Sequence, residues 1–238
     1  MNYKGMLLFF SFLAVTPLFP AHAGENISWN YAMEGQDKGR LEQFYRFPGP
    51  YKAEKKEISR GKAEYGNYRY TLWHPTVLKE REKKWPLVIC LNGTGGSEAN
   101  DEPLYEHLAS WGFLVLGNDD SQTGTGWSAE YGLEQMEALE KDKGSFLYGK
   151  VDMSHVGLIG YSQGGAGAWH ALDKPSGGRY ATIVTLSAVT KSISRRVKLE
   201  NWLYDTGKAK IPVFMISGDG LLDRKLITPL PEIKEGHP

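Results

Sequence analysis

The chain has 238 residues, of which 41% are apolar and 24% are charged. This length suits one sizeable α/β domain rather than two, and the composition is that of a globular protein, which excludes a disordered chain. Lys plus Arg and Asp plus Glu both number 28. Because the charges balance, no long-range attraction favours nucleic acid or an anionic membrane surface as a partner.

The first residues have the pattern of a secretory signal. Lys4 precedes an apolar run over residues 6–15, and an Ala-His-Ala sequence ending at Ala23 supplies the small residues that a signal peptidase reads. The sequence therefore predicts a signal peptide over residues 1–23 and an exported protein, periplasmic or secreted. A membrane anchor is the alternative, but the run is shorter than the roughly 20 apolar residues that span a bilayer. No stable membrane insertion is expected after cleavage.

Residues 24–53 are polar and aromatic and are expected to form an extended lead-in, followed by a single domain over residues 54–238. Periodicity then predicts strands near residues 68–72, 86–91, 112–116, 156–161, 181–186 and 212–217, and helices over residues 104–111, over 129–140 and from 164 onward. Short apolar strands that alternate with helices predict an α/β fold with a mostly parallel, doubly wound sheet. The site is then expected beyond the carboxyl ends of the strands.

The sequence GYSQG at residues 160–164 is the strongest functional pattern in the chain. It follows an apolar strand and precedes a run of small residues that can open a helix. Ser162 on such a turn is a candidate nucleophile, because the flanking glycines let backbone segments pass closely and the helix amides face developing negative charge. The alternative is an ordinary glycine-containing turn.

A second glycine-rich segment, LNGTGG at residues 91–96, follows the predicted buried strand. Acyl transfer generates an oxyanion that needs preorganised N–H donors. One donor in such sites is the residue after the nucleophile, here Gln163, and the other comes from the loop after this strand, for which Thr94 is the candidate. A plain glycine turn is the alternative. The segment lacks the lysine of a phosphate-cradling loop, so nucleotide binding is not expected.

Three segments together resemble a known group: ASWGFLV at residues 109–115, YGKVD at 148–152 and GLIGYSQGG at 157–165. They are similar to secreted bacterial α/β-hydrolases of the cutinase-like polyester hydrolase, chlorophyllase and dienelactone hydrolase group. The resemblance implies the α/β-hydrolase fold, Ser162 as nucleophile, and hydrolysis of a small-molecule or polymeric carboxylic ester through an acyl-serine intermediate. It implies no cofactor.

The triad acid is expected in the sequence GDGLLD at residues 218–223, with Asp223 favoured over Asp219. Only His237 lies downstream of this segment. Relatives carry the triad histidine after one more strand, so the last strand and helix of the fold are expected to be missing. Two interpretations stay open. Either His237 acts as the base from the tail, or the chain is shortened relative to its relatives and is a catalytically impaired remnant.

Other patterns carry less information. Trp127, downstream of the acidic pair Asp119 and Asp120, is a candidate wall of an acyl-binding cleft, and a surface loop is the alternative. No spaced His, Cys and Asp cluster predicts a metal site. Cys90 lies inside an apolar run and is expected to be a buried core thiol. A serine peptidase on the same fold is a further alternative, because a triad and an oxyanion hole also serve amide bonds.

Overall fold

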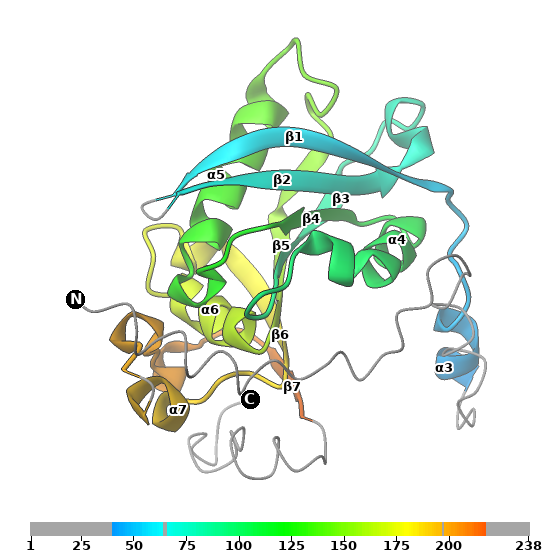
Figure 1. Cartoon of the computed structure of the whole chain (residues 1–238). Helices are drawn as coiled ribbons and strands as arrows, with labels where there is room; N and C mark the ends of the chain where they lie inside the picture. The colour runs from blue at the N-terminus through cyan, green and yellow to red at the C-terminus, as the bar shows by residue number, and fades with distance from the viewer. Residues whose placement is uncertain (1–39, 64–65, 197, 218–238) are drawn as a thin grey trace. The chain divides into compact units, whose positions relative to one another are not determined.

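The computed structural model describes residues 40–63, 66–196 and 198–217 (Figure 1). Contacts divide the chain into two compact units, Met1–Phe47 and Pro48–Pro238. The described part of the first unit holds a short helix, α3 (Arg40–Tyr45), within the segment that was expected to be extended. The predicted signal peptide lies outside the described residues.

Seven strands of the second unit form one sheet in the order β1-β2-β4-β3-β5-β6-β7 (Figure 1). The strands are β1 (Ala53–Ala63), β2 (Gly66–Pro75), β3 (Trp85–Leu91), β4 (Leu114–Asn118), β5 (Val151–Tyr161), β6 (Tyr180–Leu186) and β7 (Val213–Ile216). Strands β3 to β7 are parallel to one another, whereas β2 pairs antiparallel with both β1 and β4. This arrangement confirms the predicted α/β class with a mostly parallel sheet.

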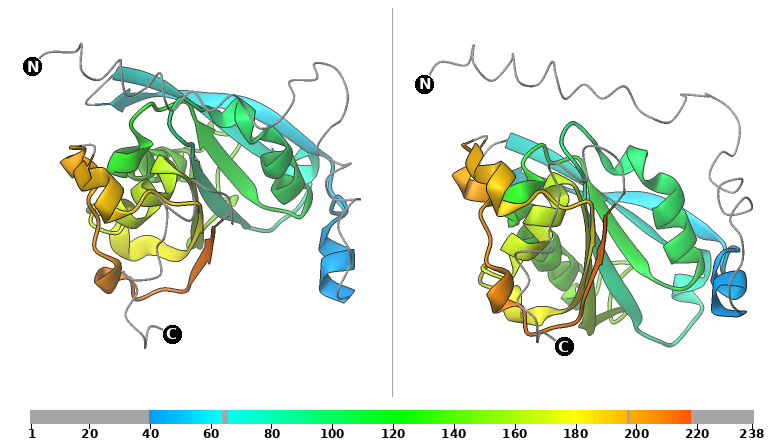
Figure 2. Two further views of the ribbon diagram at one scale, coloured as in Figure 1. Left: turned by 60° about the horizontal axis from the view of Figure 1, so that its bottom comes forward. Right: turned by 90° about the horizontal axis from the view of Figure 1, so that it is seen from below.

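Helices cover both faces of the sheet, as the two views of Figure 2 show. They are α4 (Glu102–Ser110), α5 (Trp127–Lys141), α6 (Gln163–Ala171) and α7 (Lys191–Arg196). Along β3, Leu87, Ile89 and Leu91 join the large apolar core to which α5 and α6 contribute. The alternate residues Val88 and Cys90 join a smaller core with α4. The two cores arise because successive side chains of a strand point to opposite faces.

All six strands expected from the apolar pattern are present, and β1 is an addition. Strand β5 begins five residues earlier than predicted, at Val151. Strand β1 has the sequence AEKKEISRGKA and pairs only with β2, so it lies at an edge of the sheet. Its charged side chains gave no apolar periodicity to recognise. Charged edge strands of this kind protect a sheet from pairing with other chains.

The parallel register gathers the ends of four strands at one edge of the sheet. Leu91 at the end of β3 pairs with Gly160 near the end of β5. Leu186 at the end of β6 pairs with Tyr161 on one side and with Ile216 of β7 on the other. The loops that follow β3, β5 and β6 therefore meet at the carboxyl edge, where sites of such sheets lie. Within the described ranges no helix is long and apolar enough to cross a membrane.

Candidate active site

Ser162 lies on the turn between β5 and α6 and has an unusual backbone. Its φ is 53° and its ψ is −116°, a conformation that residues other than glycine rarely adopt. Such a conformation costs about 1–3 kcal/mol and persists only where the surroundings impose it. Here the Ser162 N–H donates to the carbonyl oxygen of Leu186 (2.9 Å), and the Ser162 carbonyl accepts from the N–H of Val189 (2.9 Å). The end of β6 thus holds the strained turn.

The two glycines of the GYSQG sequence are required by close backbone contacts. A β-carbon on Gly160 would lie 2.1 Å from the carbonyl oxygen of Gly164. A β-carbon on Gly164 would lie 2.1 Å from the carbonyl oxygen of Leu91, at the end of β3. The turn therefore packs directly against the strand that leads into the second glycine-rich segment, which gives the glycine spacing a steric cause.

Gln163 is the first residue of α6. The first N–H groups of a helix have no acceptor within the helix, and the helix dipole adds positive charge there. The Gln163 side chain is buried, and its Nε2 donates to the carbonyl oxygen of Ser121 in the loop after β4 (3.0 Å). The backbone N–H of Gln163 thus lies one residue from Ser162 at the start of the helix.

The second glycine-rich segment forms a tight turn next to Ser162. The Gly96 N–H donates to the carbonyl oxygen of Gly93 (3.0 Å), and Gly95 has a φ of 73°, as the third residue of a type II turn requires. Thr94 is the exposed second residue of this turn. A β-carbon on Gly93 would lie 3.3 Å from the β-carbon of Ser162. The structure therefore brings Ser162, Gln163 and the turn of Thr94 together.

Tyr161 borders the same place and was not singled out from the sequence. Its side chain is 49% exposed, and its ring lies so close to Gly93 that a β-carbon there would approach a ring carbon to 2.7 Å. With Leu104, Ile159 and Leu186 it lines a small apolar hollow on the α4 side of the sheet. The only feature of the sequence that could have indicated Tyr161 is its place directly before the candidate nucleophile, at the end of a predicted strand. Successive side chains of a strand point to opposite faces of the sheet.

Trp127, the candidate wall of an acyl-binding cleft, packs near the end of α6 that is far from Ser162. Its ring stacks on Tyr131 with the ring centres 5.6 Å apart, and the Nζ of Lys174 lies 4.2 Å from its ring centre. Lys174 follows the last turn of α6, whereas Ser162 precedes the first. The nine residues of α6 span about 13 Å at 1.5 Å per residue. Trp127 begins α5, which packs beside the far end of α6.

Four histidines fall within the described residues, and each lies away from the carboxyl edge. Strand β2 runs antiparallel to β4, and Trp73 of β2 pairs with Val115 near the start of β4. His74 follows Trp73 and therefore lies toward the amino-terminal end of β4, away from the carboxyl edge. The other three lie in the last turn of α4, near the start of β5 and toward the far end of α6, at His107, His155 and His170. No described histidine therefore lies beside Ser162.

A second group of Ser, His and Asp side chains lies near the start of β5, at the opposite edge of the sheet. Nδ1 of His155 is 2.7 Å from Oδ2 of Asp152 and 3.1 Å from Oγ of Ser154. Both partners approach the same ring nitrogen. A catalytic triad needs the acid on one ring nitrogen and the serine on the other. This exposed group therefore lacks the geometry of a triad.

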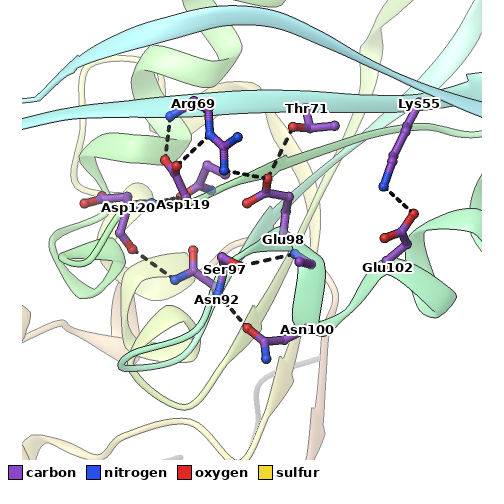
Figure 3. A network of polar contacts seen from close by, with 12 residues as sticks. Lys55, Arg69, Thr71, Asn92, Ser97, Glu98, Asn100, Glu102, Asp119 and Asp120 are labelled. Carbon is purple, nitrogen blue, oxygen red and sulfur yellow. Dashed lines mark hydrogen bonds and ion pairs between the residues drawn. The ribbon is translucent and has the colours of Figure 1, made fainter. Parts of the chain in front are cut away.

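The loop after β4 carries the acidic pair Asp119 and Asp120 and contacts Asn92, at the start of the second glycine-rich segment (Figure 3). The carboxylate of Asp119 pairs with the Nε of Arg69 (3.0 Å), and the carboxylate of Glu98 lies 3.6 Å from the same guanidinium group. Burial raises the pKa of Asp120, whose carboxylate accepts the N–H of Gln122 (2.8 Å). Both carboxylates of the acidic pair thus have partners near the loop after β4, Asp119 in Arg69 and Asp120 in the N–H of Gln122.

Of the remaining predicted residues, some lie within the described ranges and some lie outside them. Asp223, Asp219 and His237 lie outside the described residues. Cys90 is 1% exposed, which confirms a buried thiol, and burial raises its pKa. Among the described side chains, no group of three or more His, Cys, Asp or Glu residues is arranged to hold a metal ion.

The chain matches a known family over most of its described length. The profile of the family described as PETase, PET hydrolase-like, matches residues 42–191, which include Ser162, Gln163 and Thr94. The match ends before Asp223 and His237. No curated protein gives a significant match. The matched family consists of ester hydrolases with the α/β-hydrolase fold, in agreement with the observed sheet. The chain therefore belongs to the PET hydrolase-like family of α/β-hydrolases.

Proposed function

We propose that the protein is an exported serine hydrolase that cleaves carboxylic esters through an acyl intermediate on Ser162. The observation that carries this proposal is the strained turn of Ser162, with its positive φ between β5 and α6. A strained serine at a strand-to-helix turn presents its Oγ at the top of the sheet, beside the first amides of the helix. Membership of an ester hydrolase family supports the same reaction class.

The reaction follows from this arrangement. The Oγ of Ser162 attacks the ester carbonyl carbon, and the carbonyl π electrons move to oxygen to form a tetrahedral oxyanion. The N–H groups of Gln163 and Thr94 stabilise this charge, and loss of one such donor costs about 3–4 kcal/mol of transition-state stabilisation. The C–O bond to the leaving alcohol then breaks, and the alcohol takes up the proton. Water releases the acyl group in the second half of the reaction.

The base and the acid of this reaction are His237 and Asp223 in our proposal, with Asp219 as the alternative acid. The four described histidines support His237, because all of them lie away from Ser162. His237 would take the proton from Ser162 and return it to the leaving alcohol. The carboxylate would fix the histidine tautomer and stabilise the imidazolium.

The substrate class follows from the surroundings of Ser162. Tyr161, Leu104 and Leu186 supply an apolar surface, with Tyr161 49% exposed and Leu104 37% exposed. Removal of apolar area from water favours binding by roughly 25 cal/mol per Å². An ester with an apolar acyl group, either a small molecule or part of a polymer, fits this surface.

The test compares hydrolysis of p-nitrophenyl butyrate by the unchanged protein, by Ser162→Ala and by Ser154→Ala. Ser154 is a matched control, because its hydroxyl contacts a histidine and an aspartate but lies at the opposite edge of the sheet. We expect Ser162→Ala to lose turnover by several orders of magnitude and Ser154→Ala to retain it. Equal activity in all three proteins would refute the role of Ser162. A peptide anilide as second substrate distinguishes an esterase from a peptidase.

Export is tested separately by the mass of the protein recovered from a bacterial host. Cleavage after Ala23 predicts a mature chain that begins at Gly24 in the periplasm or the medium. A chain that keeps Met1 and stays inside the cell would contradict export without affecting the esterase proposal.

A further inference from the structure

Asn92 is a buried amide between the end of β3 and the turn that carries Thr94. The side chain is 1% exposed. Its Nδ2 donates to the carbonyl oxygen of Gly96 (2.8 Å), to that of Asp120 (3.0 Å) and, at a longer distance, to that of Gly93 (3.3 Å). Figure 3 shows the amide directed at the loop after β4. One side chain thus contacts both ends of the turn and a neighbouring loop.

The orientation of this amide is determined by its partners. A side-chain NH₂ group has two hydrogens, so the bonds to Gly96 and Asp120 use both. The opposite orientation would direct Oδ1 at three carbonyl oxygens, which cannot donate a hydrogen bond. Oδ1 is buried and has no partner among the described atoms. The hydrogen bonds of the Asn92 side chain are therefore all donated by its Nδ2 group.

The loop after β4 is in turn tied to the residue that follows Ser162. The Oγ1 of Thr123 donates to the backbone carbonyl of Asn92 (2.7 Å). The Nε2 of Gln163 donates to the carbonyl oxygen of Ser121 in the same loop (3.0 Å). Both proposed oxyanion donors, Thr94 and Gln163, are thus connected through the loop over residues 118–123.

We propose that Asn92 is a positioning residue that fixes the N–H of Thr94 relative to the N–H of Gln163. This inference rests on the proposed function, because an oxyanion forms only if Ser162 is the nucleophile. The turn contains three glycines, the residue with the greatest backbone freedom, and one hydrogen bond of its own, from Gly96 to Gly93. Asn92 adds bonds to the carbonyls at both ends of this turn.

The effect on catalysis follows from how such donors act. Preorganised N–H groups stabilise an oxyanion because they need not reorganise when charge develops. A displacement of about 1 Å within a site can lower the rate on the order of 100-fold. The bonds of Asn92 reach the turn and not the apolar surface at Tyr161. Loss of Asn92 therefore lowers kcat far more than it raises KM.

The experiment uses Asn92→Asp, which keeps the size of the side chain and replaces the donor with an acceptor. We expect kcat for p-nitrophenyl butyrate to fall about 10- to 100-fold with KM changed less than about threefold. Hydrogen exchange by NMR should show faster exchange of the Gly96 amide, because the carboxylate of this variant cannot donate to the Gly96 carbonyl and hold it in place.

Two further variants keep the test decisive. Thr123→Val removes the bond to the Asn92 carbonyl with little change of shape, so it should lower kcat in the same direction even if Asn92→Asp folds poorly. Glu130→Ala is a control for general destabilisation. Glu130 is a 2% exposed carboxylate that accepts the N–H of Ser176, in the connection between α6 and the start of β6. The Glu130→Ala variant should have a lower free energy of unfolding and an unchanged kcat.

The outcomes separate two failures. An active unchanged protein whose Asn92→Asp and Thr123→Val variants keep the full kcat would overturn the role of Asn92 alone. So would a rise of KM without a fall of kcat. An unchanged protein without esterase activity would overturn the proposed function, and the catalytic role of Asn92 with it.

Discussion

Gly164 and Leu91 are in such close contact that a β-carbon on Gly164 would lie 2.1 Å from the Leu91 carbonyl oxygen. This contact joins the start of α6 to the end of β3. The two segments proposed to supply oxyanion donors begin at these two points, at Gln163 and after Leu91. Their separation is therefore set by backbone packing.

Replacement of Gly164 by alanine tests this packing. The new β-carbon meets backbone rather than a flexible side chain, so we expect Gly164→Ala to lower the free energy of unfolding by about 3 kcal/mol. Gly178→Ala is the matched control, because nothing lies within 4 Å of a β-carbon there. It should change stability by less than about 0.5 kcal/mol. Urea titration measures both, and equal stability of the two variants would contradict the contact.

Cys90 provides a chemical test of the core. The thiol is 1% exposed and its pKa is raised by burial, so little thiolate forms at neutral or mildly alkaline pH. We expect no reaction with Ellman's reagent in the native protein at pH 8, and reaction of the one cysteine per chain in guanidinium chloride. Rapid reaction of the native protein would show that the smaller core beside α4 is open.

His170 predicts a pH dependence of stability. Burial, and then the charge of Lys174, lowers its pKa below the ordinary 6.5. Below pH 6.5 the unfolded chain binds the proton more tightly than the folded chain, so stability falls as the pH falls toward the folded pKa. One such proton contributes a slope of at most about 1.4 kcal/mol per pH unit. Urea titrations of the unchanged protein and of His170→Gln at pH 7.5, 6.5 and 5.5 should show a smaller loss in the variant.

The proposed base is tested with His237→Ala, and His155→Ala serves as control. The described part of β5 places His155 at the opposite edge of the sheet from Ser162, so its loss should not change turnover. Loss of a triad histidine removes the group that takes the serine proton, and we expect kcat to fall by about 10³-fold or more. Asp223→Asn, compared with Asp219→Asn, identifies the acid in the same assay. An unchanged rate in His237→Ala would exclude it as the base.

The apolar pattern predicted strands β2 to β7 because each of them packs apolar side chains against a core on at least one face, which β7 does through the partly buried Val213 and Met215. Strand β1 was missed for the opposite reason. Its residues 53–63 are mostly charged, and its place in the sheet depends on main-chain pairing with β2 rather than on apolar side chains. Such pairing leaves no periodic signal in the sequence.

The sequence likewise indicated some features of the candidate site and not others. The strand-to-helix turn at Ser162 and Gln163 could be predicted, because glycine spacing records a steric requirement of the backbone. The contacts of Trp127 with Tyr131 and Lys174 could not be predicted, because nearness in sequence to the loop after β4 does not show along which helix α5 packs. Asn92 gave no signal as a positioning residue, because its hydrogen-bond partners Gly96 and Asp120 are brought together only by the fold.

The most direct test of the central claim is covalent labelling by a fluorophosphonate, with the modified residue identified by mass spectrometry. An activated serine displaces fluoride from phosphorus and keeps the phosphonyl group on its oxygen. We predict one modified residue, Ser162, in the unchanged protein and no labelling of Ser162→Ala. Labelling that persists in Ser162→Ala would contradict the account.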